Sequence, residues 1–199
     1  MSAIPKRKLT AAEYLVVERA AAFKSEFLDG EMFAMAGASR EHNTVKENLI
    51  VELGARLKAG PCRSYSSDQR VRVNATGLYT YPDIVIVCGE PRYADDDADT
   101  LVNPRVVIEV LSHSTQRYDR TTKFSHYAKL PSMLEYVLVW PDAPMIERYV
   151  RQDDGDWAFR AFRTLEELFA LATVTAEVAM ADVYRDVTFP PELEPPQQK

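Results

Sequence analysis

The stretch NPRVVIEVLSHSTQRYDRTTKF, residues 103–124, places one carboxylate inside an apolar run and a lysine shortly after it. Val106 to Leu111 is short and rich in β-branched residues, which predicts a buried strand. Glu109 lies in the middle of that strand. A buried, ionised carboxylate without a partner is strongly unfavourable. We therefore expect Glu109 to be protonated, ion-paired, placed at the edge of the sheet or bound to a cation.

The composition bounds the class of protein. A chain of 199 residues with 46% hydrophobic and 27% charged residues predicts one globular domain over residues 1–189, followed by a Pro-rich, disordered tail at 190–199. No apolar run is long enough for a membrane helix, so we expect a cytoplasmic protein with no membrane partner. The net charge of -6 argues mildly against a protein that coats nucleic acid. Cys62 and Cys88 have neither metal-knuckle spacing nor a disulfide framework, and we expect free thiols.

The first part of the chain predicts helix, hairpin, helix. Thr10 and Glu13 form a capping-box signature, which predicts a helix over residues 11–22. Asp29-Gly30 between two short apolar runs predicts a β-hairpin. A long helix is predicted over residues 39–60, because apolar residues recur there at helical spacing. Those residues are Val45, Leu49, Leu53 and Leu57.

The remainder predicts a sheet with helices on it. Strands are expected at 65–73, 81–89, 106–111 and 135–140. A helix capped by Asp119 and ending near Pro131 separates the last two, which favours a right-handed parallel crossover, whereas the earlier strands can pair antiparallel. A hairpin is predicted over 146–162, and 164–184 is ambiguous between helix and short strands. The acidic segment 93–100 indicates a solvated loop, with a calcium site as the less favoured alternative. The prediction is an α/β fold with a mixed β-sheet flanked by helices and an added N-terminal helix and β-hairpin.

Strand geometry brings two carboxylates together. If the 81–89 and 106–111 strands are antiparallel neighbours, Asp83 at the start of one lies near Glu109 towards the end of the other. Two carboxylates at short range favour a cation between them, and such oxygen ligands suit Mg²⁺ or Mn²⁺. Lys123 lies on the following helix, one turn before Tyr127, and can point back at this site. Its ammonium could orient or help deprotonate a water, or stabilise negative charge on phosphorus.

These residues carry a family resemblance. Four strings resemble the restriction endonuclease family sometimes called Uma, within the PD-(D/E)xK nuclease superfamily: YPDIVIV, VVIEVLS, YDRTTKFSHY and EYVLV. The similarity extends from EFLDGE at residue 26 to about residue 150. It implies a restriction endonuclease-like core and Mg²⁺-dependent hydrolysis of DNA phosphodiester bonds. It also implies that Asp83 and Glu109 are metal ligands, with the backbone carbonyl of Val110 as a further ligand.

The chain departs from the superfamily pattern at one position. Leu111 stands two residues after Glu109, where the simplest motif has its lysine, so the lysine role is assigned to Lys123. An additional acidic residue is expected from an earlier element, and Glu31 is favoured over Glu47. His42, at the start of the long helix, is a further candidate for the catalytic site.

Each candidate also has a structural alternative. Asp83 can be a turn residue that caps a backbone N–H. His42 can be a half-buried, hydrogen-bonded histidine, and Lys123 can be a solvated lysine whose stem covers apolar surface. Glu109 can form an ordinary salt bridge with Arg105, Arg117 or Lys123.

The leading hypothesis is a Mg²⁺-dependent endodeoxyribonuclease whose metal is held by Asp83 and Glu109 and assisted by Lys123. A catalytically inactive DNA- or protein-binding module with the same fold is the alternative, and Leu111 and the acidic net charge motivate it. A third hypothesis keeps the metal chemistry but changes the substrate to RNA or a nucleotide. A homodimer, which would bring one site to each DNA strand, is a further hypothesis.

Overall fold

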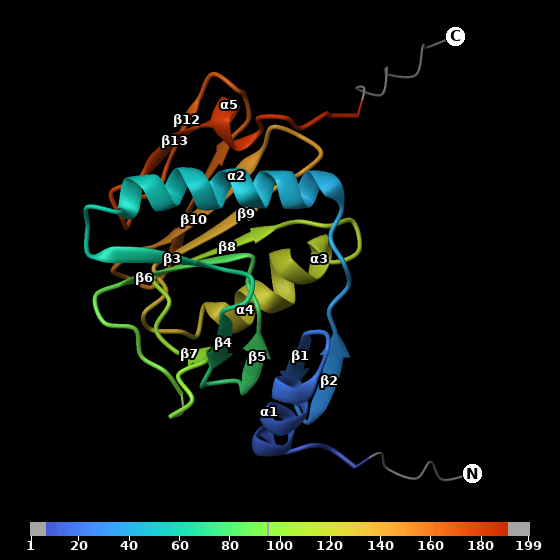
Figure 1. Ribbon diagram of the computed structural model, residues 1–199. Coiled ribbons are helices and arrows are strands. Elements are labelled where there is room, and N and C mark those ends of the chain that lie inside the picture. Colours follow the sequence, from blue (N-terminus) through green and yellow to red (C-terminus); the bar gives the residue numbers. More distant parts are fainter. Residues whose placement is uncertain (1–6, 95, 191–199) are drawn as a thin grey trace.

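The computed structural model describes residues 7–94 and 96–190, which form three sheets with helices around them (Figure 1). The helical segments are α1 (Ala11–Ala20), α2 (Arg40–Leu57), α3 (Gln116–Tyr118), the π-helical segment η1 (Asp119–Lys123), α4 (Phe124–Tyr127) and α5 (Met180–Val183). The strands are β1 (Ser25–Leu28), β2 (Glu31–Ala34), β3 (Cys62–Ser66), β4 (Arg70–Val73), β5 (Leu78–Thr80), β6 (Ile84–Cys88), β7 (Thr100–Leu101), β8 (Val106–Val110), β9 (Glu135–Val139), β10 (Ile146–Arg151), β11 (Trp157–Phe162), β12 (Leu168–Ala170) and β13 (Glu177–Ala179). Apart from Pro190, the predicted tail lies outside the described residues.

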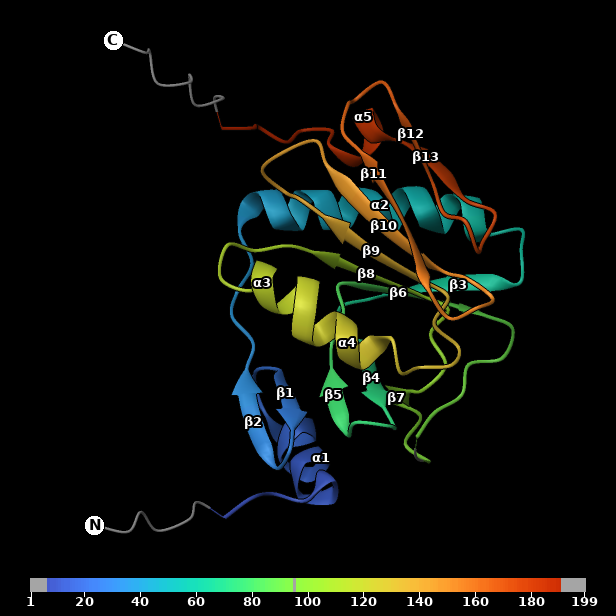
Figure 2. The same cartoon turned by 180° about the vertical axis from the view of Figure 1, so that it is seen from behind.

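A six-stranded sheet in the order β11-β10-β9-β8-β6-β3 forms the centre of the molecule. β8 and β9 are parallel, and their connection through α3, η1 and α4 is the predicted crossover. β6 and β8 are antiparallel, as expected. α2 crosses one face of this sheet, and the α3–η1–α4 helix lies on the other (Figures 1 and 2). The predicted mixed sheet flanked by helices is therefore confirmed.

Side chains of β8 point alternately to the two faces of the central sheet. Val106, Ile108 and Val110 pack in the cluster that contains α2. Val107 and Leu111 pack in a second cluster, on the side of α4 and of the smaller sheet. Because side chains alternate along a strand, Glu109 projects into this second layer.

A five-stranded sheet in the order β2-β1-β5-β4-β7 lies below the α3–η1–α4 helix in the view of Figure 1. The Thr10–Glu13 capping box begins α1 as predicted, and Tyr14 of that helix stacks on Phe27 of β1 with ring centroids 4.7 Å apart. The β1–β2 hairpin turns at Asp29-Gly30, with φ of 51° and 84°. Positive φ at both central residues is the tight hairpin turn that such a dipeptide favours.

Three predicted boundaries were wrong. Residues 65–73 do not form one strand, since β3 and β4 belong to different sheets and a polar turn at Ser66–Gln69 separates them. The segment before Asp83 supplies an additional short strand, β5. The helix after β8 begins at Gln116, so Asp119 lies inside it and is buried instead of capping it.

The C-terminal part completes the fold. β10 and β11 form the predicted hairpin around Gly155. The ambiguous segment 164–184 resolves into the two-stranded β12–β13 sheet and the short α5, which pack against α2. Across the described ranges, every helix is too short or too polar to cross a membrane.

The prediction of two free thiols was wrong. Cys62 and Cys88 form a disulfide. They are 26 residues apart in sequence, but the antiparallel pairing of β3 with β6 places them directly opposite each other. The strand register, which the spacing of the cysteines does not reveal, brings them together.

Candidate active site

The register of β6 and β8 brings Asp83 and Glu109 together. Ile84 pairs with Ile108, so the residue before β6 lies across from Glu109. The backbone N–H of Val110 donates a 2.9 Å hydrogen bond to Asp83 Oδ2, and the N–H of Asp83 lies 3.4 Å from Glu109 Oε2. Asp83 and Glu109 therefore lie close together, as the antiparallel strand pairing predicted.

Glu109 is almost completely buried, with 3% of its surface exposed. Its Oε1 accepts a 2.9 Å hydrogen bond from the Tyr127 hydroxyl and lies 3.0 Å from the ammonium nitrogen of Lys123. Its Oε2 faces Asp83. The carboxylate inside the apolar strand is therefore paired through one oxygen with a lysine and a tyrosine of the following helix.

Lys123 joins three carboxylates from three different elements. Its Nζ lies 3.0 Å from Glu109, 3.2 Å from Glu26 on β1 and 3.4 Å from Asp119 one turn earlier in its own helix. The π-helical segment that contains Asp119 and Lys123 turns both side chains inwards, and both are buried. The burial of Lys123 excludes the alternative that it is a solvated lysine on the helix surface.

Glu26, rather than Glu31, is the acidic residue that the N-terminal hairpin brings to this cluster. Glu31 begins the edge strand β2 and is exposed, whereas β1 lies inside the sheet beside β5. Glu26 accepts hydrogen bonds from Thr80 on β5 and from the Tyr118 hydroxyl, the latter at 3.1 Å. Glu47 is exposed on α2 and does not reach the site either. The sequence held only a weak signal for Glu26, which directly precedes Phe27 and Leu28 but does not stand inside an apolar run as Glu109 does.

His42 contacts the other side of Asp83. Ser39 caps α2 by accepting the N–H of His42, so this side chain projects from the first helical turn. Its Nε2 lies 3.2 Å from Asp83 Oδ2. His42 is buried, and within the described part of the chain its Nδ1 has no hydrogen-bond partner. Asp83 Oδ2 is thus held by a backbone N–H and an imidazole.

Burial shapes the ionisation of this cluster. Burial raises the pKa of Glu109 to about 8, against the attraction of Lys123, and the charges of Asp119 and Asp83 add to the rise. Burial also raises the pKa of Asp119. For Lys123, burial alone would lower the pKa, but attraction to Glu109, Glu26 and Asp119 raises it well above the usual value. The site therefore holds one permanent cation among more carboxyl groups than that cation can neutralise.

The oxygens that remain fit a hard divalent cation. In a strand, the N–H and C=O of one residue point towards the same neighbouring strand. Because the N–H of Val110 binds Asp83, its carbonyl faces the same way, and the residue across from it is Pro82, which has no N–H to donate. Two carboxylates and one carbonyl match the small protein contribution that Mg²⁺ needs. Across residues 7–94 and 96–190, no three His, Cys, Asp or Glu side chains are grouped for a metal. A Mg²⁺ ion held by two carboxylates and a carbonyl would therefore need several waters to complete its octahedral coordination.

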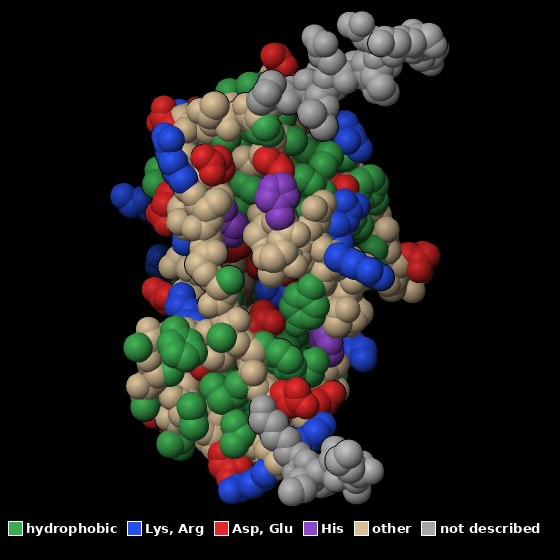
Figure 3. Space-filling view, turned by 90° about the vertical axis from the view of Figure 1, so that its right-hand side faces the viewer, with side chains coloured by type: hydrophobic (Ala, Val, Ile, Leu, Met, Phe, Trp, Pro, Cys, Tyr) green, Lys and Arg blue, Asp and Glu red, His purple; other side chains and the backbone are tan. Residues whose placement is uncertain are grey.

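The side of the molecule on which α2 begins has a furrowed surface (Figures 1 and 3). The start of α2 and the loop after β8 meet on the right-hand side of Figure 1. Viewed from that side, the surface is furrowed between the upper and lower parts of the molecule, and acidic, basic and histidine side chains border the furrow (Figure 3).

The fold and the central cluster define a restriction endonuclease-like α/β protein. The fold matches a crystal structure described as "a putative nuclease belonging to DUF820", from Anabaena variabilis ATCC 29413, with a TM-score of 0.71 and 17% identity, over 88% of this chain and 97% of that one. Residues 11–182 match the family Uma2, described as "Putative restriction endonuclease". The chain therefore belongs to the Uma2 family, which confirms the resemblance seen in the sequence.

Two relatives come from Synechocystis sp. (strain ATCC 27184 / PCC 6803 / Kazusa). "Uncharacterized protein slr1290" is 34% identical over 187 residues, which are 93% of this chain and 96% of that protein. "Uncharacterized protein sll1609" is 36% identical over 149 residues, which are 75% of this chain and 84% of that protein. The likeness to slr1290 thus extends over nearly the whole of both chains.

Proposed function

We propose that the protein is an endonuclease that hydrolyses DNA phosphodiester bonds with the help of Mg²⁺ or Mn²⁺. The observation that carries this proposal is the convergence of Asp83, Glu109 and Lys123 from two strands and a helix, with Lys123 3.0 Å from Glu109. The chain belongs to the Uma2 family, which is described as "Putative restriction endonuclease", and this membership supports the proposal. The fold shared with the Anabaena protein is consistent with it.

The site residues divide into ligands and supports. Asp83, Glu109 and the Val110 carbonyl would hold the cation, which when bound would act as a Lewis acid on a phosphoryl oxygen. His42 and the Val110 N–H fix Asp83 Oδ2, while Lys123 fixes Glu109 Oε1. One oxygen of each carboxylate is thereby positioned and the other is left for the cation and its waters.

Lys123 has a second role in this proposal. Hydrolysis adds water to phosphorus and breaks a phosphorus–oxygen bond, so negative charge grows on the phosphoryl oxygens. A fixed ammonium close to that charge stabilises the transition state more than the substrate. Glu26 and Asp119 hold Lys123 in place from two further directions.

Cleavage of supercoiled plasmid tests the proposal. The wild type is incubated with Mg²⁺, Mn²⁺ or EDTA beside Asp83→Asn and Glu109→Ala, with folding checked by circular dichroism. Glu47→Gln is the matched control, since it changes an exposed carboxylate on α2. We expect nicking that requires the metal, survives in Glu47→Gln and is lost in both site variants.

A DNA-binding assay and cleavage of a matched RNA, run on the same variants, separate the alternatives. If the wild type binds DNA but cuts nothing with either metal, and Asp83→Asn binds equally well, the protein is a binding module of nuclease fold. If it cuts a matched RNA but not the plasmid, the metal chemistry stands and the DNA substrate is wrong.

A further inference from the structure

A pocket lies at the end of β6 opposite to Asp83. Its volume is about 530 Å³, within the range of small-molecule sites. Its walls include both cysteines of the disulfide, two arginines and two threonines: Cys62, Cys88, Arg56, Arg105, Thr173 and Thr175. None of these residues belongs to the candidate active site.

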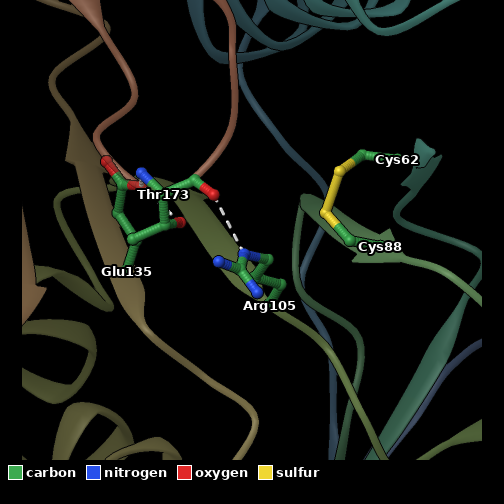
Figure 4. The surroundings of a disulfide bond; sticks show 5 residues. All are labelled: Cys62, Cys88, Arg105, Glu135 and Thr173. Atoms are coloured by element: carbon green, nitrogen blue, oxygen red, sulfur yellow. Dashed lines mark hydrogen bonds between the residues drawn. A yellow bond between two sulfur atoms is a disulfide. The ribbon is translucent and has the colours of Figure 1, made fainter. Parts of the chain in front are cut away.

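Arg105 carries the charge that the pocket offers to a ligand. Its Nε donates a 2.9 Å hydrogen bond to the carbonyl of Thr173 (Figure 4). Among the described residues, no carboxylate lies within ion-pair distance of Arg105, and its two terminal nitrogens have no hydrogen-bond partner. Arg56, by contrast, is paired with Glu52 of its own helix. The unpaired guanidinium favours an anionic ligand.

The loop that orients Arg105 is itself fixed. Glu135 is fully buried, and its carboxylate accepts the N–H groups of Ala172 and Thr173 at 2.9 Å and 3.0 Å and the Thr173 hydroxyl at 2.9 Å. The carbonyl of Thr173 is therefore held where Arg105 binds it. Figure 4 shows the Arg105 side chain between this loop and the disulfide. The positive charge is preorganised beside a bond that thiols can attack.

We propose that this pocket is a docking and thiolation site for a small anionic thiol, which opens the Cys62–Cys88 disulfide by exchange. Cys88 is the more exposed of the two cysteines and is the expected point of attack. The thiolate bonds to the Cys88 sulfur, the disulfide breaks, and the electron pair leaves on the Cys62 sulfur, which takes a proton from water. A second thiolate attacks the mixed disulfide, so two thiols become one external disulfide and both cysteines are reduced. This inference does not depend on the nuclease activity.

Three thiols of similar size but different charge test it: mercaptoethanesulfonate, mercaptoethanol and mercaptoethylamine. The full chain is purified without reductant and treated with each thiol. Iodoacetamide then stops the reaction by alkylating free thiols, and intact mass spectrometry measures the mass of the protein. Opening rates are divided by thiolate concentration, because the thiolate is the nucleophile. We expect the sulfonate to react roughly fivefold faster than mercaptoethanol and the amine to react slowest, as one nearby charge in water predicts.

Arg105→Gln should make the three thiols open the disulfide at similar thiolate-normalised rates. Arg105→Lys should keep most of the difference between them, because it keeps the positive charge. Arg63→Gln is the matched control, because Arg63 adjoins Cys62 on β3 but is exposed and does not line the pocket. Equal thiolate-normalised rates for the three thiols in the wild type would overturn the proposal. So would an equal effect of Arg63→Gln and Arg105→Gln, or alkylation of both cysteines before any thiol is added.

Discussion

The ammonium of Lys123 lies 3.0 Å from Oε1 of Glu109, and both residues are buried, with 5% of Lys123 and 3% of Glu109 exposed. In the simplest nuclease motif the lysine stands two residues after the acidic residue on the same strand. Here that position is Leu111, which is buried in the apolar cluster that also contains Tyr127. A long side chain from the next helix reaches the same carboxyl group, so the contact between lysine and acidic residue is kept although its sequence spacing is not.

Replacing Lys123 by methionine should destabilise the fold strongly. The change keeps the length of the side chain but leaves Glu109, Glu26 and Asp119 close together without a cation. Removing one member of a buried ion pair costs about 3 kcal/mol or more. Urea unfolding at neutral pH should show a loss of this size in the free energy of unfolding.

Lys129→Met is the control for that experiment. It removes the same charge from an exposed lysine a few residues later, and a change below about 0.5 kcal/mol is expected. Equal stability of the two variants would show that the Lys123 network contributes nothing net to the fold.

Glu26→Gln should reduce plasmid cleavage, whereas Glu31→Gln should not. Glu26 lies 3.2 Å from Lys123, while Glu31 is exposed on the edge strand. If the Lys123 ammonium acts in cleavage as proposed, loss of one charged group that positions it is expected to lower the rate on the order of tenfold to a hundredfold. Initial nicking rates of the two folded variants provide the measurement. A slower Glu31→Gln beside an unaffected Glu26→Gln would return the role to Glu31.

Much of the fold follows from local sequence signals. The capping box of α1, the Asp29-Gly30 turn and the apolar spacing of α2 each describe short-range chemistry that a sequence displays directly. The Asp83–Glu109 pair followed from strand alternation and antiparallel pairing. These predictions depend only on neighbours along the chain or on one strand pair.

The missed features depend on pairings between distant elements. Glu26 reaches Lys123 only because β1 pairs with β5 in a second sheet, and that sheet exists because the 65–73 segment divides between two sheets. The disulfide likewise depends on the register of β3 with β6. Asp119 was assigned to a cap because aspartate favours that position, but burial beside Lys123 overrode the preference.

Gly30→Ala should destabilise the hairpin that carries Glu26. Gly30 has φ of 84°, and an added Cβ would lie 2.5 Å from the Cβ of Lys8. The left-handed conformation alone costs an alanine about 1 kcal/mol, and the close contact should add to this. Gly77→Ala is the matched control, because Gly77 has φ of 72° and no neighbour within 4 Å of the added atom. Thermal unfolding should show the larger loss for Gly30→Ala, and equal losses would mean that the contact with Lys8 relaxes freely.

Asp99 should make stability depend on acid pH. Its carboxylate binds Arg19 of α1 at 2.8 Å, Arg70 of β4 at 2.6 Å and the hydroxyl of Thr100 at 2.7 Å. The hydrogen bond from Arg19 is the largest cause that holds the pKa of Asp99 far below its usual value, and Thr100 and Arg70 add to it. Because the folded-state pKa is lowered, the stabilisation is present above the unfolded pKa of about 4 and declines as the pH falls through the folded value.

Asp99→Asn should therefore lower the free energy of unfolding by about 1 kcal/mol at neutral pH, a modest figure because solvent screens the half-exposed carboxylate. The gap to the wild type should narrow as the pH falls below about 4, because Asp99 then takes up a proton in the unfolded chain while it stays charged in the folded protein. Asp97→Asn is the control: Asp97 contacts Arg19 at 2.7 Å, but its side chain is 64% exposed, so little change is expected. Urea unfolding across this pH range measures both variants. A gap for Asp99→Asn that stays constant down to the lowest pH would mean that packing, not the charge of Asp99, joins α1 to the second sheet.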